Sequence, residues 1–235
     1  LTRAYGSKRE SKLHVDLADV VGLLCVRQAK GGAPTTLASS TTVYNAFLAR
    51  HPELVPMLYE GFHWDRFSEH AAWDQPMTPK RIPVFSYAGG QLSCRYNRSW
   101  ILGAFARMEK QLSNAEPVSY THLRAHEKVL FDFFDQAAEE NRLEIDLQPG
   151  QVYFASNYTV LHGRAAYEEE TEDFGEKRHL LRVWLNMPGF RAFADEATVR
   201  FGLTSHGNIG WTGAELLARK HLQPGHQRSF VAGAA

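Results

Sequence analysis

Residues 143–167, LEIDLQPGQVYFASNYTVLHGRAAY, decide the fold class expected for this chain. Three short segments that read as β-strands follow one another here, and a Pro-Gly pair marks the turn after the first. The segments are LEIDL (143–147), QVYFASNY (151–158) and VLHGRAAY (160–167). Consecutive strands at such short spacing are typical of β-sandwiches and jelly rolls.

Further strands and two main helices are expected on either side of this segment, from hydrophobic periodicity and from turn residues. The expected elements are extended segments at 13–29 and 178–187, a hairpin at 83–96 that turns at Gly89-Gly90, a loop at 30–40, helices from Thr41 and over 123–140, and a short helix at 212–221. Strands interrupted by helices favour a mainly β fold with helices packed outside it. We expect a single domain over 1–235, with a core at about 12–188 and a C-terminal extension at 189–235.

Composition excludes several classes of protein. The chain has 235 residues, of which 44% are hydrophobic and 22% charged, so a folded domain is expected. Acidic and basic residues balance at 26 each, which argues against a nucleic-acid or membrane-surface partner. No apolar run reaches the length of a membrane span. The two cysteines, Cys25 and Cys94, are predicted to be buried thiols of a cytoplasmic protein.

The segment RHLLRVW (178–184) places two arginines in an otherwise apolar strand. Because side chains alternate along a strand, Arg178, Arg182 and Trp184 share one face. The two guanidinium groups are then about 13 Å apart, too far to hold one small carboxylate together. They are either cations of an edge strand that reach solvent or acidic partners, or donors that bind anions in a pocket.

Three His-x-acid pairs are candidates for binding a divalent metal: His14/Asp16, His51/Glu53 and His63/Asp65. With eleven histidines, such a pair also arises by chance. His51 precedes a helix start, where a first-turn carboxylate explains the pair, and His63 lies in a loop-like stretch. His14 and Asp16 lie on a strand that enters the core, and we therefore favour them.

A metal site of this kind needs a second histidine, and two histidines with one carboxylate leave coordination positions open for small molecules. His162, in an apolar strand, is the best candidate. A lone histidine there is otherwise a hydrogen-bonded core residue.

Four separated blocks occur in an order that resembles the taurine dioxygenase-like (TauD/TfdA) family of iron(II)/2-oxoglutarate-dependent oxygenases. The blocks are LHVDLADVVGLLCVRQAKGG, PVFSYAGGQLSCRY, LQPGQVYFASNYTVLHGRAAYEE and RHLLRVWL. The resemblance covers most of residues 12–188. It implies a double-stranded β-helix, a variant of the jelly roll. It also implies a dioxygenase that oxidises, most simply by hydroxylation, a small organic and in some members acidic substrate, with release of succinate and CO2.

The resemblance also implies roles for single residues. His14, Asp16 and His162 match the ligands of Fe(II), while 2-oxoglutarate and O2 are the co-substrates. Arg178 matches the arginine that binds the distal carboxylate of 2-oxoglutarate, and Arg182 matches one that contacts an acidic substrate in some members. The family's Ser/Thr that helps to hold 2-oxoglutarate falls at Thr35, with Thr36 as the alternative.

The chain departs from the family in two places. The His14/Asp16 pair lies close to the start of the chain, where the family has a substantial N-terminal portion, so we expect an N-terminally truncated domain. PVSYTHLRAHE (117–127) does not match the family and reads equally well as translated adaptor sequence or as a divergent linker.

Three other functions are compatible with the same residues: a zinc hydrolase, a non-catalytic jelly-roll module that binds a metal or an anion, and an inactive truncated oxygenase. No general base for hydrolysis stands out in the sequence. The expected partner is a small molecule, and the sequence is compatible with a homo-oligomer.

Overall fold

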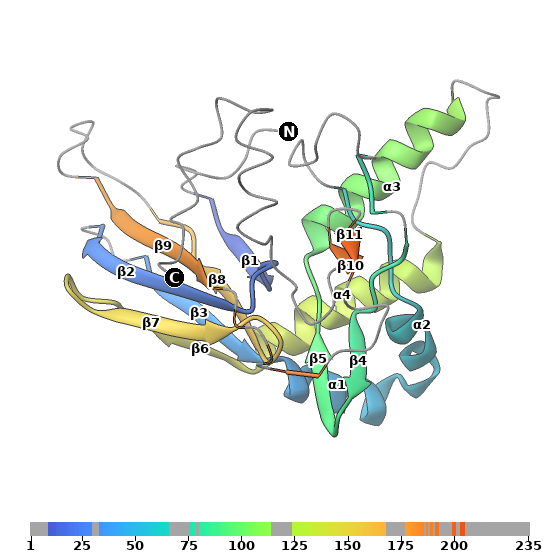
Figure 1. The fold of residues 1–235 in the computed structure, drawn as a ribbon, viewed down its shortest axis with the longest axis horizontal. Coiled ribbons are helices and arrows are strands. Elements are labelled where there is room, and N and C mark those ends of the chain that lie inside the picture. Colours follow the sequence, from blue (N-terminus) through green and yellow to red (C-terminus); the bar gives the residue numbers. More distant parts are fainter. Residues whose placement is uncertain are drawn as a thin grey trace.

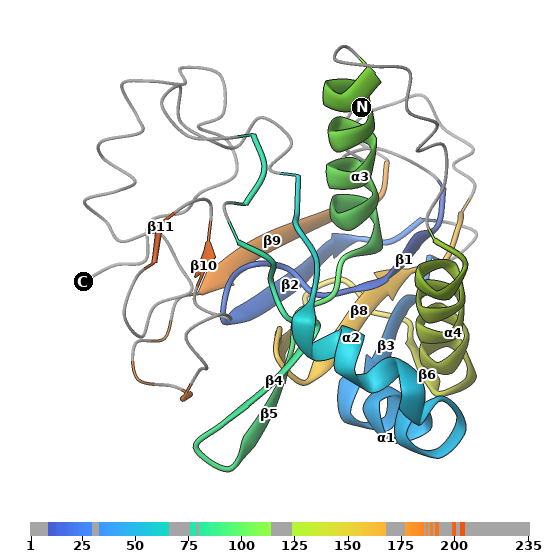
Figure 2. The same cartoon turned by 90° about the vertical axis from the view of Figure 1, so that its right-hand side faces the viewer.

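The computed structural model describes residues 9–29, 33–65, 76–78, 80–113, 124–167, 177–185, 187, 189, 191–192, 199–200 and 203–204. Two antiparallel sheets lie on one side of the molecule and the helices gather on the other (Figures 1 and 2). The four-stranded sheet has the order β1 (Ser11–His14), β8 (Val160–Arg164), β3 (Thr35–Ser39) and β6 (Arg142–Ile145). The three-stranded sheet has the order β7 (Val152–Ser156), β2 (Val20–Arg27) and β9 (His179–Leu185).

The remaining elements are a hairpin, a short strand pair and the helices. They are β4 (Phe85–Ala88) with β5 (Gln91–Cys94), β10 (Val199–Arg200) with β11 (Leu203–Thr204), α1 (Ser40–Arg50), the 3-10 helix η1 (Pro52–Leu54), α2 (Val55–Glu60), α3 (Arg98–Ser113) and α4 (Ala125–Glu140). The hairpin turns at Gly89 and Gly90, whose φ angles of 56° and 77° favour glycine. This confirms the expected hairpin and its turn.

The two faces of the four-stranded sheet have different roles. Its outer face packs on α1 and α4 and contributes Leu13, Ala38 and Leu161 to the main hydrophobic core. The largest side chains of that core include Phe47 of α1 and Phe131 and Phe134 of α4, all buried. Its inner face points to the three-stranded sheet. The candidate functional residues described below lie between these two sheets, where Asp16 contacts Arg182 and Trp184 of β9.

Local sequence explains why α1 begins where it does. The hydroxyl oxygen of Ser39 accepts a hydrogen bond from the backbone N–H of Thr42 at 3.2 Å and so caps the first turn. The helix ends at His51, before Pro52 starts the short 3-10 helix. The helix start expected after His51 is therefore present.

Two expectations about local structure were wrong. Residues 30–40 are not all loop, because Thr35–Ser39 form β3 in the middle of the four-stranded sheet. The pairing of this strand with both β6 and β8 overrides its loop-like composition. Helix α3, Arg98–Ser113, was also not expected. The helix expected at 212–221 and most of segment 117–127 lie outside the described residues; Arg124 and the residues after it lead into α4.

The mainly β fold with flanking helices is confirmed. Both cysteines are buried and unpaired, as expected. Among the described residues, no helix combines the length and the apolar character needed to cross a bilayer.

Candidate metal centre

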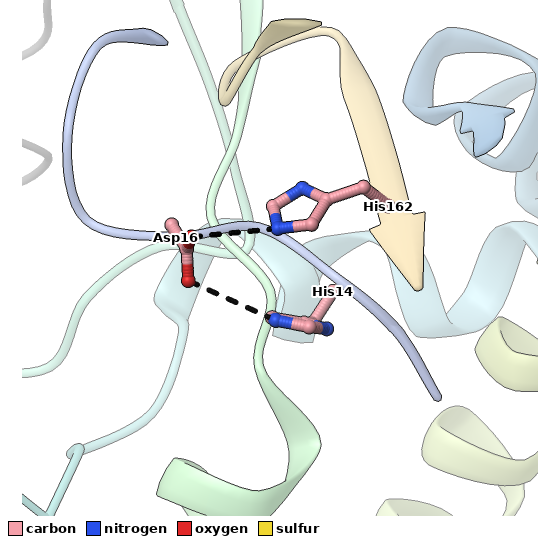
Figure 3. Close-up of side chains that lie close together, drawn as sticks. All are labelled: His14, Asp16 and His162. Atoms are coloured by element: carbon pink, nitrogen blue, oxygen red, sulfur yellow. Dashed lines mark ion pairs between the residues drawn. The ribbon is translucent and has the colours of Figure 1, made fainter. Parts of the chain in front are cut away.

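The side chains of His14, Asp16 and His162 lie close together (Figure 3), on the side of the four-stranded sheet where Asp16 contacts Arg182 and Trp184 of β9. His14 ends β1 and lies directly opposite His162 of β8, and their ring centroids are 4.6 Å apart. A register irregularity between Ser11 and His14 accompanies this pairing. Asp16 follows two residues after His14, and its carboxylate turns back toward both rings. We call these three residues the His–Asp–His cluster.

The His14 ring is oriented by a hydrogen bond to the backbone. Its Nδ1 lies 2.7 Å from the carbonyl oxygen of Lys12, which can only accept, so Nδ1 carries the proton. The other nitrogen, Nε2, then has a free lone pair and lies 3.8 Å from Asp16 Oδ1. Burial lowers the pKa of His14 to about 4, and the nearby His162 adds to this effect. His14 is therefore a neutral imidazole at neutral pH, which is the form that binds metals.

The Asp16 carboxylate is ionised despite its burial. Desolvation by itself raises the pKa of Asp16, but the Arg182 guanidinium and the hydrogen bond and charge of His162 outweigh it and hold the pKa well below its usual range. The shortest contact of its Oδ2 atom is with the indole N–H of Trp184, at 2.7 Å. Arg182 Nη1 donates to the same oxygen at 3.3 Å, and His162 Nε2 lies 3.5 Å away.

Two buried polar residues hold the backbone around Asp16. Asn157 accepts a hydrogen bond from the Asp16 N–H at 3.0 Å, and Arg95 donates to the carbonyl oxygens of Asp16 and Leu17 at 3.3 and 3.2 Å. Both side chains are buried. The loop between β1 and β2 is thereby fixed at the point where it presents its carboxylate.

This donor set fits a divalent metal with open coordination positions. One ligand atom from each of the three residues lies within 4.8 Å of the others, and two imidazoles with one carboxylate form the facial triad typical of non-haem Fe(II) oxygenases. Among the described residues, no second group of this kind was found. The donor atoms present therefore suit Fe(II).

The two competing His-x-acid pairs have local partners instead. His51 Nδ1 lies 3.0 Å from Glu53 at the start of the 3-10 helix. His63 Nδ1 donates to the Thr78 carbonyl at 2.9 Å, while Asp65 binds Arg107 at 2.7 Å. Within the part of the chain that the structure describes, neither pair belongs to a group of three possible metal ligands.

Arg178 lies just before β9, on the face that points toward the four-stranded sheet. Its Nε donates to Gln28 Oε1 at 3.0 Å. Its guanidinium also lies over the ring of Tyr167, 5.5 Å from the centroid, and Arg164 contacts the same ring at 4.7 Å. Two cations therefore gather around Tyr167 beside the gap between the sheets.

Strand register separates Thr35 from Thr36. Leu37 pairs with His162 and Thr35 pairs with Arg164, so Thr35 shares the inner face with the histidines. Thr36 pairs with Gly163 and points to the opposite face, where the helices pack. Both threonines are buried, but Thr35 alone of the two lies on the same side as the His–Asp–His cluster.

Four residues near the cluster were given no role from sequence. The alternation of side chains along the strand puts Trp184 on the same face as Arg182, and this could have indicated that Trp184 lies near the cluster. Nothing in the sequence distinguishes Arg95 or Asn157 from other residues. Tyr153 is the fourth. It is in register with Leu23, which pairs in turn with Arg182, and its buried hydroxyl has no hydrogen-bond partner among the described residues.

Comparison with known proteins decides the family. The model of the taurine catabolism dioxygenase TauD, TfdA family matches residues 2–184. The chain belongs to this family. FR-33289 synthase of Streptomyces rubellomurinus is 33% identical over 205 residues, covering 86% of this chain and 57% of that protein. The taurine hydroxylase-like protein SAT17 of Stachybotrys chartarum is 28% identical over 171 residues, 72% of this chain and 40% of that protein. This member of the TauD/TfdA family thus spans only about half the length of these relatives.

Solved oxygenase structures share its fold. Asparagine oxygenase, in a complex with Fe(II), 3-hydroxyasparagine and succinate, superposes with a TM-score of 0.54 at 17% identity, over 76% of this chain and 50% of that one. The non-haem iron oxygenase OrfP in complex with Fe has a TM-score of 0.51 at 17% identity, over 77% of this chain and 52% of that one. The likeness confirms the jelly-roll fold class expected from the sequence.

Proposed function

We propose that this protein is an Fe(II)/2-oxoglutarate-dependent dioxygenase that hydroxylates a small organic substrate with an acidic group. The observation that carries the proposal is the convergence of His14, Asp16 and His162 between two sheets in a member of the TauD/TfdA family. In the proposed reaction one oxygen atom of O2 enters the substrate C–H bond as a hydroxyl group. The other enters succinate, as 2-oxoglutarate loses CO2.

The cluster would hold the iron, which when bound supplies the activation of O2. The chain's own contribution is to orient these ligands and to keep them in the charge state that binds metal. The Lys12 carbonyl directs the lone pair of His14 toward Asp16, and burial keeps the His14 ring neutral. Arg182 keeps Asp16 ionised.

Three groups are candidates for binding 2-oxoglutarate. Arg178 is a permanent cation that can bind a carboxylate through two N–H groups. Thr35 shares the face of the histidines and offers a hydroxyl donor. The unpartnered Tyr153 hydroxyl also favours a polar ligand in this gap, because burying a hydroxyl without a hydrogen bond costs about 1–3 kcal/mol.

The relatives and Arg182 guide the choice of substrate. Solved neighbours are complexed with 3-hydroxyasparagine and, for OrfP, with a dihydroxy-arginine beside succinate, and one relative is named for taurine hydroxylation. Amino acids and taurine all carry an acidic group, which Arg182 could bind. We further propose a cytoplasmic protein that acts on a free small molecule, without nucleic acid or membrane as partner, either as a monomer or as a homo-oligomer.

The test is the release of succinate from 2-oxoglutarate by the Fe(II)-loaded protein in air, with a panel of amino acids, carboxylates and sulfonates. One compound should raise succinate release and yield hydroxylated product in equal amount. His14→Ala and Asp16→Ala should abolish this release, while His63→Ala, the matched control, should retain it.

Other outcomes identify the alternatives. Binding of Fe(II) and 2-oxoglutarate without succinate from any compound would indicate a non-catalytic module or an inactive oxygenase. Hydrolysis that needs Zn(II) and proceeds without O2 would indicate a hydrolase. Loss of metal from His63→Ala but not from His14→Ala would show that the wrong histidine was assigned.

A further inference from the structure

Trp184 is the last inward-facing residue of β9 and contacts the carboxylate of Asp16. Its indole nitrogen, Nε1, lies 2.7 Å from Asp16 Oδ2, the shortest of the contacts that this oxygen makes with neighbouring side chains. The backbone of Trp184 pairs with Val21 in the middle strand of the three-stranded sheet. The donor is therefore fixed to one sheet, whereas both histidines of the cluster belong to the other.

The two side chains that donate hydrogen bonds to Oδ2, Trp184 and Arg182, differ in their chemistry. An indole N–H can only donate, and it is neutral at every pH of interest. Arg182 is a charged donor on a long side chain, and at 3.3 Å it is the more distant of the two. Its guanidinium stacks over the Trp184 ring at 4.8 Å from the centroid, so the two side chains also support each other.

The two carboxylate oxygens consequently face different surroundings. Oδ2 accepts from Trp184 of β9 and also lies 3.5 Å from His162 Nε2, while Oδ1 is turned to His14 Nε2 at 3.8 Å. A hydrogen-bond donor on one oxygen fixes the rotation of a carboxylate and so directs its other oxygen. Because Trp184 supplies this donor without a charge, Asp16 would remain oriented even when Arg182 turns to another anion.

We propose that Trp184 is a positioning residue whose indole N–H fixes the metal-binding carboxylate of Asp16. This inference rests on the metal site of the proposed function. It assigns Trp184 a role through its N–H group, distinct from the packing of its ring.

The test compares Co(II) binding to the apo protein and its variants by calorimetric titration. Trp184→Phe keeps an aromatic ring but removes the donor, and it should weaken Co(II) binding about 10- to 100-fold, the usual effect of losing a hydrogen-bond partner of a metal ligand. Trp184→His restores a ring N–H and should recover part of this loss. Arg182→Lys should cost less than Trp184→Phe, because the closer donor remains.

The matched control is Trp100→Phe, which removes an indole of α3 that packs edge-on against Trp64. Its Co(II) affinity should equal that of the wild type. Thermal unfolding of each apo variant separates a weakened site from a weakened fold. Co(II) binding by Trp184→Phe within threefold of wild type would overturn the inference, as would equal losses in the Phe and His variants.

A second measurement does not require a variant of Trp184. Indole N–H exchange with solvent, followed by NMR in the apo protein, should become faster for one tryptophan in Asp16→Ala than in wild type. No change in any indole N–H would overturn the inference. Failure of the proposed metal site is distinguishable from either result, because wild-type protein would then not bind Co(II) in a His14-dependent manner. Failure of catalysis alone would appear as wild-type protein that binds Co(II) through His14 but releases no succinate, and it leaves the comparison of variants unchanged.

Discussion

Arg178 and Arg182 lie on the same face of one strand but have different neighbours. Arg182 contacts Asp16 and stacks on Trp184, while Arg178 binds Gln28 and lies over Tyr167. The contrast follows from their separation along the strand, which puts only Arg182 level with the cluster. At the scale of single residues, we therefore expect the two arginines to serve different ligands.

Arg178→Leu is expected to weaken 2-oxoglutarate binding by about 3 kcal/mol, somewhat more than a hundredfold, because a carboxylate would lose its cationic partner in a partly buried site. Arg178→Lys should recover only part of this loss, since an ammonium cannot make the two-pronged contact. The measurement is anaerobic titration of the Fe(II)-loaded protein with 2-oxoglutarate.

Arg142→Leu is the control for this prediction, because Arg142 of β6 pairs with Glu139 of α4 and with Glu144 of its own strand. It should bind 2-oxoglutarate as the wild type does. If Arg178→Leu bound 2-oxoglutarate as the wild type does, Arg178 would have only a structural role, through its contact with the Tyr167 ring.

At the scale of elements, the register of β3 and β8 determines which side chains face the gap. Leu37 opposite His162 sets the alternation for both strands, so Thr35 and Arg164 face inward and Thr36 and Gly163 face the helices. A shift of one residue would exchange these sets. The site therefore depends on the pairing of these strands as much as on the residues themselves.

Thr35→Val and Thr36→Val form a matched pair of variants on this strand. Thr35→Val should weaken 2-oxoglutarate binding by about 1 kcal/mol, the typical contribution of one hydrogen bond, with little change in stability. Thr36→Val should leave 2-oxoglutarate binding unchanged. The same anaerobic titration decides between them, and the reverse pattern would show that Thr36 is the ligand.

Gly163 of β8 lies against the backbone of β1. A Cβ atom at this position would lie 2.5 Å from the backbone oxygen of Ser11 and 2.8 Å from Thr36 Oγ1. Because backbone cannot move aside as a side chain can, Gly163→Ala should push β1 from β8, destabilise the protein by about 1–3 kcal/mol and weaken metal binding through His14. Chemical denaturation of the apo protein and Co(II) titration measure the two effects.

Gly22→Ala is the comparison for Gly163→Ala. The atoms nearest to its Cβ would be side-chain atoms, of Phe154 at 2.6 Å and of Val183 at 2.8 Å, on the face away from the cluster. Phe154 is 60% exposed and can move. Metal affinity should therefore be unaffected in Gly22→Ala, and an equal loss in both variants would contradict the proposed role of Gly163.

At the scale of the whole molecule, the cluster joins parts of the fold that are distant along the chain. Its ligands come from β1, from the loop after it and from β8, and it is closed by Arg182 and Trp184 of the other sheet. The outer face of the four-stranded sheet is held by the aromatic core of α1 and α4. A metal at the cluster would bind the folded state only, because the unfolded chain does not bring these residues together.

Zn(II) at a hundredfold excess over its dissociation constant should therefore stabilise the protein by about 2.7 kcal/mol. For a domain of this size that corresponds to a rise in Tm of about 5–10 °C. EDTA should reverse the shift, and Asp16→Ala should not show it. Thermal unfolding followed by circular dichroism measures the effect, and an equal shift in Asp16→Ala would mean that Zn(II) binds elsewhere.

Much of this protein follows from the sequence alone. The alternation of apolar residues predicts most of the strands, and the Gly89-Gly90 pair predicts the hairpin turn, because both depend on contacts between near neighbours. The choice of His14 and Asp16 over the other His-x-acid pairs also came from local context. Its place in an apolar strand likewise favoured His162 as the second histidine, and the family resemblance adds predicted roles for Arg178 and Arg182.

Tertiary structure decided the rest. Thr35–Ser39 looks like a loop in isolation and becomes a strand only because β6 and β8 supply its hydrogen bonds on both sides. The same pairing shows that Thr35, and not Thr36, lies on the face of the sheet that carries the histidines, a distinction that the sequence does not make. The contacts of Asp16 with Trp184 and Arg182 cross from one sheet to the other, and no periodicity along the chain records which side chains meet across such a gap. Local sequence patterns determined most of the strands and which side chains share a face, because these depend on near neighbours along the chain. The packing of the two sheets against each other determined which faces meet to form the candidate metal site.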